Sequence, residues 1–93
     1  MIRSFRDTEA EHIFHRRRSR KLPQSIQRVA LRKLRMLNRA DTMNDLRVPP
    51  ANRLEKRSGN RAGQHSIRIN NQWRVCFIWK DGDAWDAEIV DYH

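Results

Sequence analysis

The alternation of apolar and polar side chains over residues 65–79, HSIRINNQWRVCFIW, constrains the fold more than any other feature of the chain. Side chains on a strand point to its two faces in turn, so this period of two predicts strands that each bury one face. Asn70-Asn71 and Asp81-Gly82 are typical of turns between antiparallel strands. The expected core positions are Ile67, Ile69, Trp73, Val75, Phe77 and Trp79.

The first turn decides which polar side chains share the other face. If the apolar positions of both strands face the core, the turn is a three-residue loop, Asn70 to Gln72. Arg68 and Arg74 then lie side by side on the opposite face, where two like charges repel each other. We therefore expect either an anion between the two guanidinium groups or a carboxylate paired with each. The candidate carboxylates are Glu55, Glu88 and Asp91.

The second turn leaves the facing of the last residues open. A three-residue turn over 81–83 would put Tyr92 on the arginine face. A two-residue turn over 81–82 would put Asp91 and His93 there instead. In both cases the last residues extend along a strand next to the one that carries the second arginine.

The first half of the chain predicts helices. Residues 2–5 are typical of a short strand, after which Asp7 and Thr8 are candidate helix caps. Thr8 with Glu11 also has the spacing of a capping box at the start of a short helix. Pro23 suits the first turn of a second helix. This helix carries a core-facing stripe of apolar residues at spacings of three and four. They are Ile26, Val29, Ala30, Leu34 and Leu37.

Residues 38–52 contain Pro49 and Pro50, so we expect an irregular link there. The predicted order is one N-terminal strand, two helices and an antiparallel meander of about four strands. This order indicates an α+β fold in which the meander packs against the helices. A chain of 93 residues has room for one domain, which we expect to span residues 1–93.

The balance of charges predicts a polyanionic or acidic partner. The chain has 20 Lys and Arg residues against 11 Asp and Glu residues, a formal charge of +9. Most of the basic residues are arginines, whose guanidinium groups pair with phosphate in a bidentate manner and stack on bases, which favours RNA or DNA. Four arginines fall away from the apolar stripe of the second helix, where they are either solvated or bind RNA or an acidic partner. They are Arg28, Arg32, Arg35 and Arg39.

The lone cysteine, Cys76, excludes an intrachain disulfide and any CxxC motif, and it fits a reducing cytosol. The N-terminus lacks an apolar core of signal-peptide length, and no stretch of the sequence is apolar enough to span a membrane. We therefore expect a cytoplasmic protein. The histidines lack metal-ligand spacing and no glycine loop fits a phosphate, so we expect no metal and no cofactor.

The residues at the C-terminus have side chains that can transfer protons. RNA can be cleaved without a metal when a base removes the proton of the 2′-hydroxyl, an acid protonates the leaving oxygen and cations hold the charge on phosphorus. Arg68 and Arg74 could supply the cations, while Asp91, Tyr92 and His93 could transfer the protons. A polar tripeptide at a chain end is, however, more often simply solvated.

Three segments together, LRVPPANRLE, SGNRAGQHSIRINNQWRVCFIW and EIVDYH, resemble the HigB-type toxins of the RelE/ParE superfamily. The resemblance implies a RelE-like fold and a toxin of a type II toxin–antitoxin system that enters the A site of translating ribosomes and cuts mRNA. It also implies a helix-turn-helix, HigA-like antitoxin that forms a hetero-oligomer with the toxin. By this likeness Arg74 binds the phosphate, and Asp91, Tyr92 and His93 complete the site.

The chain departs from the pattern at Glu55, where some relatives have a histidine, so Glu55 is a further catalytic candidate. Five basic residues are expected to bind RNA. They are Arg53, Lys56, Arg57, Arg61 and Arg68. Related toxins of similar fold act on DNA gyrase without a nuclease site, so the rival expectation is a non-enzymatic toxin that binds and blocks the ribosome or gyrase.

Overall fold

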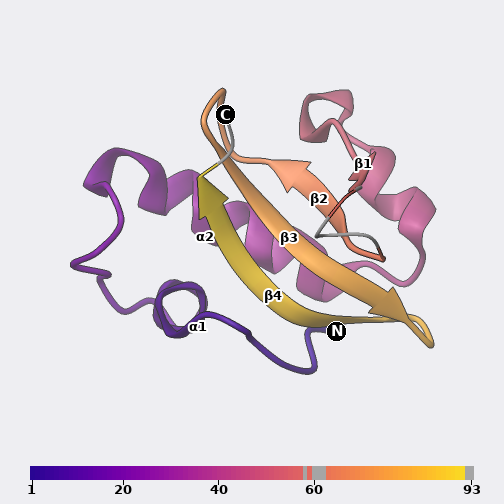
Figure 1. Ribbon diagram of the computed structural model, residues 1–93, viewed down its shortest axis with the longest axis horizontal. Coiled ribbons are helices and arrows are strands. Elements are labelled where there is room, and N and C mark those ends of the chain that lie inside the picture. The colour runs from indigo at the N-terminus through magenta and orange to yellow at the C-terminus, as the bar shows by residue number, and fades with distance from the viewer. Residues whose placement is uncertain (58, 60–62, 92–93) are drawn as a thin grey trace.

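The alternating region forms a four-stranded antiparallel sheet in the computed structural model, which describes residues 1–57, 59 and 63–91 (Figure 1). The strands are β1 (Glu55–Lys56), β2 (His65–Arg68), β3 (Trp73–Lys80) and β4 (Asp83–Asp91). Each pairs with the next along the chain, in the order β1-β2-β3-β4. The predicted antiparallel meander is confirmed.

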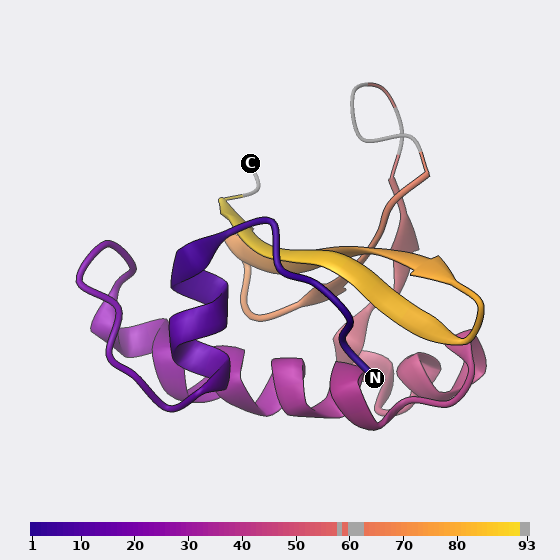
Figure 2. The ribbon, with the colours of Figure 1, turned by 90° about the horizontal axis from the view of Figure 1, so that it is seen from below.

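Two helices precede the sheet, α1 (Thr8–Phe14) and α2 (Gln24–Arg39). Figure 2 shows α2 as a layer below the sheet, with α1 standing at one end. Of the two candidate caps, Asp7 is confirmed, whereas the capping box at Thr8 is wrong because Thr8 is already helical. The Asp7 carboxylate accepts a hydrogen bond from the Glu9 N–H at 2.9 Å, which satisfies an unpaired donor of the first turn.

The apolar stripe of α2 packs on one face of the sheet. Its buried residues are Ile26, Ala30, Leu34 and Leu37, and the buried residues opposite are Ile67, Val75 and Phe77. Val29 is only half-buried, whereas Lys33 is buried on this stripe. Because the side chains of β3 alternate, Arg74 and Cys76 point to the sheet face away from α2.

The link after α2 is more ordered than the sequence predicts. It contains two short 3₁₀ helices, η1 (Met43–Arg47) and η2 (Pro50–Asn52). Thr42 and Asp45 form a capping box at the start of η1. Arg53 ends η2 in the left-handed conformation, with φ 43°, and this turn brings the chain into β1.

The N-terminal segment is not the regular strand expected over residues 2–5. It makes two isolated parallel bridges to the edge of β4, Ile2 to Ala84 and Phe5 to Ala87. Between these bridges β4 has a bulge at Asp86, which has φ 53°, so the two bridges do not extend into a continuous ladder.

Candidate active site

Arg74 is the most constrained of the predicted site residues. It lies on β3 with only 4% of its surface exposed. Its Nε donates to Ser66 Oγ at 2.7 Å, and one terminal nitrogen donates to the Ser66 carbonyl at 3.2 Å and to the Arg53 carbonyl. These bonds fix the plane of the guanidinium group in a site from which water is largely excluded.

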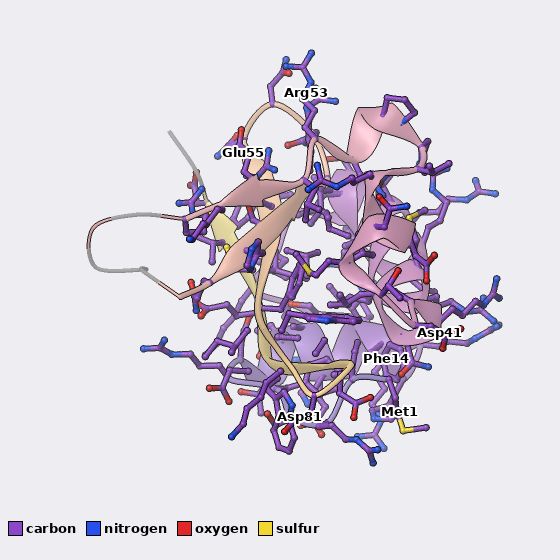
Figure 3. The ribbon with its side chains drawn as sticks, turned by 90° about the vertical axis from the view of Figure 1, so that its right-hand side faces the viewer. Met1, Phe14, Asp41, Arg53, Glu55 and Asp81 are labelled. Atoms are coloured by element: carbon purple, nitrogen blue, oxygen red, sulfur yellow. The ribbon has the colours of Figure 1, made fainter. Side chains whose placement is uncertain are left out.

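Glu55 is the acid beside this guanidinium group. One of its carboxylate oxygens lies 3.8 Å from the Arg74 terminal nitrogen, and 45% of the Glu55 side chain is exposed. Glu55 lies opposite Ser66 on β2, whose Oγ binds Arg74, so the sheet register brings three strands to one point. Figure 3 shows Glu55 and Arg53 at the same end of the molecule. In such an arrangement the solvent-accessible carboxylate can accept or donate a proton, while the fixed cation stabilises negative charge on a phosphate.

The predicted register of the first turn is confirmed, because Arg68 lies directly opposite Arg74. The two side chains nevertheless have different partners. The Arg68 guanidinium donates to the Asn71 side chain, while that of Arg74 lies against Glu55. For Arg74 the expected carboxylate pairing therefore holds.

The second turn has two residues, since Lys80 pairs with Asp83. Asp81 and Gly82 have φ values of 54° and 78°, both in the left-handed region that this short hairpin turn requires. A two-residue turn was expected to place Asp91 on the same face as Arg74. That expectation is wrong, because β4 contains a bulge after the turn.

A β-bulge shifts the register of β4 by one residue. Ile78 lies opposite Trp85, but Cys76 lies opposite Glu88, so β4 has one extra residue in between. As a result Val90 lies opposite Arg74, and Asp91 lies opposite Trp73 on the other face. Asp91 is exposed there and accepts a hydrogen bond from Gln72 Nε2 at 3.2 Å.

The bulge gives Glu88 a place on the Arg74 face, which the turn alone does not predict. Its carboxylate lies 3.7 Å from Arg6 and 3.5 Å from Gln64 Nε2. Ser66 therefore belongs to the site, although it was not among the predicted catalytic residues, and period-two alternation from Arg68 could have found it. Glu88 was one of the carboxylates expected beside the arginine pair; it lies on the same face but contacts Arg6 and Gln64.

The structure places two of the predicted RNA-binding residues next to Arg74. Arg68 lies opposite it on β2, and the exposed Arg53 contributes the carbonyl that it binds. Lys56 is exposed but pairs with His65 on the other face, and Arg57 is half-buried. The Arg53 carbonyl also binds Arg74, a role for the backbone that side-chain patterns do not reveal. Arg61, Tyr92 and His93 lie outside the described residues, and their roles stay predictions.

A buried lysine supports the turn that holds Arg74. The Lys33 ammonium group donates to Asn52 Oδ1 at 2.5 Å, and Asn52 Nδ2 donates to the Leu46 carbonyl at 3.1 Å. Burial is the main cause that lowers the pKa of Lys33, and the nearby charges of Arg32 and Arg68 add to it. Asn52 directly precedes Arg53, so this pair anchors the carbonyl that receives Arg74.

His65 lies on the face that packs toward α2, at the start of β2 between Lys56 of β1 and Phe77 of β3. Its ring stacks on Phe77 at a centroid distance of 6.3 Å. Burial and the neighbouring Lys56 lower the pKa of His65, which favours the neutral imidazole. In the described part of the chain, no three metal-binding side chains form a cluster, and neither helix has the length and apolar composition needed to cross a bilayer.

Comparison with known proteins identifies the family. Residues 3–93 match the family model of the RelE-like toxin of the type II toxin–antitoxin system HigB. The chain belongs to this toxin family. Toxin HigB-1 of Vibrio cholerae is 42% identical to this chain over 85 residues, which cover 90% of each protein. An uncharacterized protein of Haemophilus influenzae is 42% identical over 64 residues, which cover 69% of this toxin and 63% of that protein.

A solved structure supports the fold. A chain of the YoeB–YefM complex from Staphylococcus aureus matches the whole toxin and 95% of its own length, with a TM-score of 0.60 and 20% identity. At this identity the likeness concerns the fold, and it confirms the expected RelE-like α+β architecture. As a member of a type II family, the toxin has an antitoxin as its partner.

Proposed function

We propose that this toxin is a ribosome-dependent endoribonuclease that cuts mRNA in the ribosomal A site and so inhibits translation. The observation that carries the proposal is the Arg74 guanidinium, held by Ser66 and the Arg53 carbonyl and flanked by the exposed Glu55 carboxylate. A cation fixed before the reaction stabilises charge developing on phosphorus without reorganising, and this effect is large where water is excluded.

The chemistry is attack by the 2′-hydroxyl on the adjacent phosphorus. The 2′-oxygen forms a bond to phosphorus, the bond from phosphorus to the 5′-oxygen breaks, and a 2′,3′-cyclic phosphate and a 5′-hydroxyl result. Arg74 stabilises the negative charge on the phosphoryl oxygens. Glu55 is the candidate base, and we assign protonation of the leaving oxygen to His93, with Tyr92 as the other C-terminal candidate. Asp91, which lies on the other face of the sheet from Arg74, has no part in this assignment.

The ribosome accounts for the charge of the toxin. Ribosomal RNA surrounds any protein in the A site with phosphates, to which arginines bind strongly. Arg53, Arg57, Arg61 and Arg68 would hold mRNA or ribosomal RNA next to Arg74, and Lys56 would contact RNA from the other face of the sheet. The proposed partner in the resting state is a helix-turn-helix, HigA-like antitoxin in a hetero-oligomer, and the site of action is the cytoplasm.

Primer extension on one labelled mRNA tests the proposal. The mRNA is incubated with the toxin, once bare and once bound to translating ribosomes, and Arg74→Lys and Glu55→Gln are compared with the exposed control Arg17→Lys. We expect cuts only on ribosomes, a loss of about 100-fold or more for Arg74→Lys, and no loss for the control. Circular dichroism checks that each variant folds. Growth arrest without cuts would instead indicate a toxin that blocks its target by binding.

A further inference from the structure

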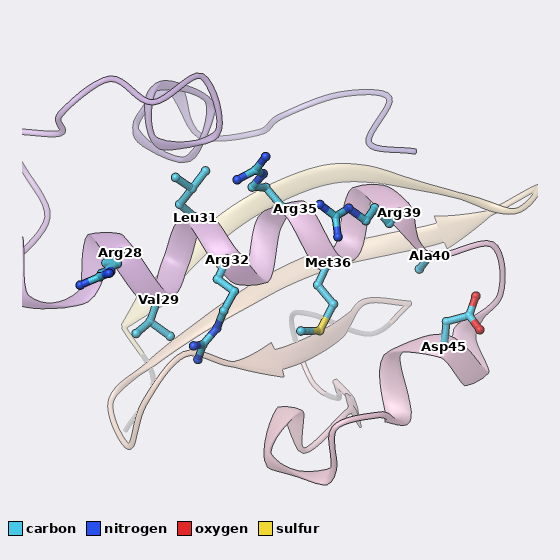
Figure 4. A pocket seen from close by; sticks show the side chains of 9 residues that line it. All are labelled: Arg28, Val29, Leu31, Arg32, Arg35, Met36, Arg39, Ala40 and Asp45. Atoms are coloured by element: carbon cyan, nitrogen blue, oxygen red, sulfur yellow. The ribbon is translucent and has the colours of Figure 1, made fainter.

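Four exposed arginines form a stripe along the outer face of α2. They are Arg28, Arg32, Arg35 and Arg39, at spacings of four, three and four, which align side chains on one side of a helix. They border a groove of about 680 Å³, called here the α2 groove. In Figure 4 the half-buried Val29 and Met36 lie between the arginines along the helix.

The toxin itself does not neutralise this stripe. Among residues 1–57, 59 and 63–91, no carboxylate forms an ion pair with any of the four guanidinium groups. Asp45 lines the groove, but its carboxylate accepts the backbone N–H groups of Asp41 at 2.9 Å and of Thr42 at 3.1 Å. These hydrogen bonds lower the pKa of Asp45, and the Asp45 carboxylate is bound to the backbone that caps η1. The positive charge of the groove is therefore available to a partner.

The groove combines two properties that select its partner. The arginines require negative charge, whereas Val29 and Met36 between them offer apolar surface that a phosphate backbone would not use. A second copy of the toxin would bring its own arginines against these and would be repelled. An acidic amphipathic helix satisfies both properties, because it can present carboxylates on its flanks and apolar side chains between them.

We propose that the α2 groove binds an acidic amphipathic helix of the antitoxin. This inference rests on the proposed function, since it locates the contact that recruits the antitoxin. The stripe from Arg28 to Arg39 spans eleven steps of about 1.5 Å, or about 17 Å, so the bound helix needs about three turns. Its Asp and Glu residues should recur at spacings of three and four, beside Leu, Ile or Val.

The position of the groove defines what this contact does. The inner face of α2 packs on the sheet, and the register of β2 and β3 points Arg74 to the opposite face of that sheet. A helix in the α2 groove is therefore separated from the Arg74 face by α2 and the sheet. The contact anchors the antitoxin and leaves it to another antitoxin segment to cover the Arg74 face.

A charge-reversal experiment tests the contact. The affinity of the purified antitoxin encoded with the toxin is measured calorimetrically for the toxin, for Arg32→Glu/Arg35→Glu and for the matched control Arg17→Glu/Arg18→Glu, whose arginines are also exposed. We expect the groove variant to bind at least about 30-fold more weakly and the control to stay within about threefold. Equal affinities of the two variants would overturn the proposal.

Ribosome-dependent cleavage without antitoxin separates the two proposals. The groove variant should cut mRNA within about threefold of the unmodified toxin, because the groove lies away from Arg74. A variant that keeps its antitoxin affinity but loses cleavage would assign the groove to RNA and overturn the inference. If the unmodified toxin cuts nothing while the groove variant still loses the antitoxin, the nuclease proposal fails and the docking site stands.

Photocrosslinking identifies the segment in the groove. Met36 is replaced by p-benzoylphenylalanine, the toxin–antitoxin complex is irradiated, and the crosslinked antitoxin peptide is sequenced by mass spectrometry. We expect a segment with recurrent Asp or Glu at helical spacing. A crosslink to a basic segment, or the absence of any crosslink in a complex that has formed, would refute the contact.

Discussion

Replacing Asn52 by leucine should destabilise the toxin strongly, because Asn52 is the hydrogen-bond partner of a buried ammonium group. Lys33 is 4% exposed and Asn52 is fully buried. Without the Asn52 amide oxygen, 2.5 Å from Lys33 Nζ, the lysine would keep its desolvation cost and lose the acceptor that offsets it.

The magnitude follows from the bonds that are lost. A hydrogen bond to a charged group contributes about 1.5–3 kcal/mol, and a buried group left unsatisfied costs about 1–3 kcal/mol. Asn52→Leu also removes the bond to the Leu46 carbonyl, so we expect a loss of about 3–4 kcal/mol. Lys33→Met leaves only a neutral oxygen unsatisfied and should cost about 1–2 kcal/mol. The double variant should be about 2 kcal/mol more stable than the sum of these losses, because neither orphaned group remains.

The pH dependence of the lysine has a definite sign. Burial lowers the pKa of Lys33 in the folded state, so the unfolded chain binds more protons between this lowered pKa and the ordinary lysine value. In that interval the contribution of Lys33 to stability becomes more favourable as the pH rises. Lys33→Met should remove this contribution, whereas Lys21→Met, at an exposed position, should keep it.

Urea unfolding of the toxin and the three Lys33 and Asn52 variants, at about pH 7 and about pH 10, measures these terms. A coupling free energy below about 0.5 kcal/mol would refute the interaction between the two side chains. An unchanged pH dependence in Lys33→Met would refute the lowered pKa of the lysine.

Two further predictions concern the N-terminal segment. Ser4→Ala should lower the free energy of unfolding by about 1–2 kcal/mol, because the Ser4 hydroxyl donates to Asp86 Oδ1 and accepts from the Asp86 N–H at the bulge. Thermal melts measure this loss, with Ser4→Thr, which keeps the hydroxyl, as the control. Asp83→Asn should destabilise the toxin near neutral pH, because hydrogen bonds from Arg3 and the N-terminal ammonium group lower the pKa of Asp83. That stabilisation is present above the ordinary carboxyl pKa and is lost as the pH falls through the lowered value, so urea unfolding should show the difference shrinking in acid, and a difference that persisted there would contradict it.

The hairpin of β2 and β3 could be predicted because its determinants are local. Alternating side chains fix the faces of both strands, and the loop from Asn70 to Gln72 is the one length that keeps both apolar sets in the core. The observed pairing of Arg68 with Arg74 follows from this argument. The burial of Lys33 could also be predicted from the sequence, because Lys33 falls inside the apolar stripe of α2 that faces the core.

The facing of Asp91 could not be predicted, because it depends on the bulge at Asp86. An aspartate adopts positive φ more readily than most residues, but nothing in its neighbours distinguishes Asp86 from other aspartates of the chain. Its hydrogen-bond partner is Ser4, 82 residues away in the sequence. The hydrogen bond from Arg74 to the Arg53 carbonyl could not be predicted for a similar reason. Every residue has a backbone carbonyl, and only the tertiary fold determines which one lies next to Arg74.

A single 2′-deoxynucleotide decides whether the toxin cleaves RNA by the chemistry proposed for Arg74 and its neighbours. The cut site is first mapped on ribosome-bound mRNA, and the nucleotide on its 5′ side is then replaced by its 2′-deoxy form. If the 2′-hydroxyl is the nucleophile, the substituted mRNA stays intact at that position while the all-ribose mRNA is cut to a 2′,3′-cyclic phosphate and a 5′-hydroxyl. Equal cleavage of the two mRNAs, with a 5′-phosphate on the product, would contradict the mechanism.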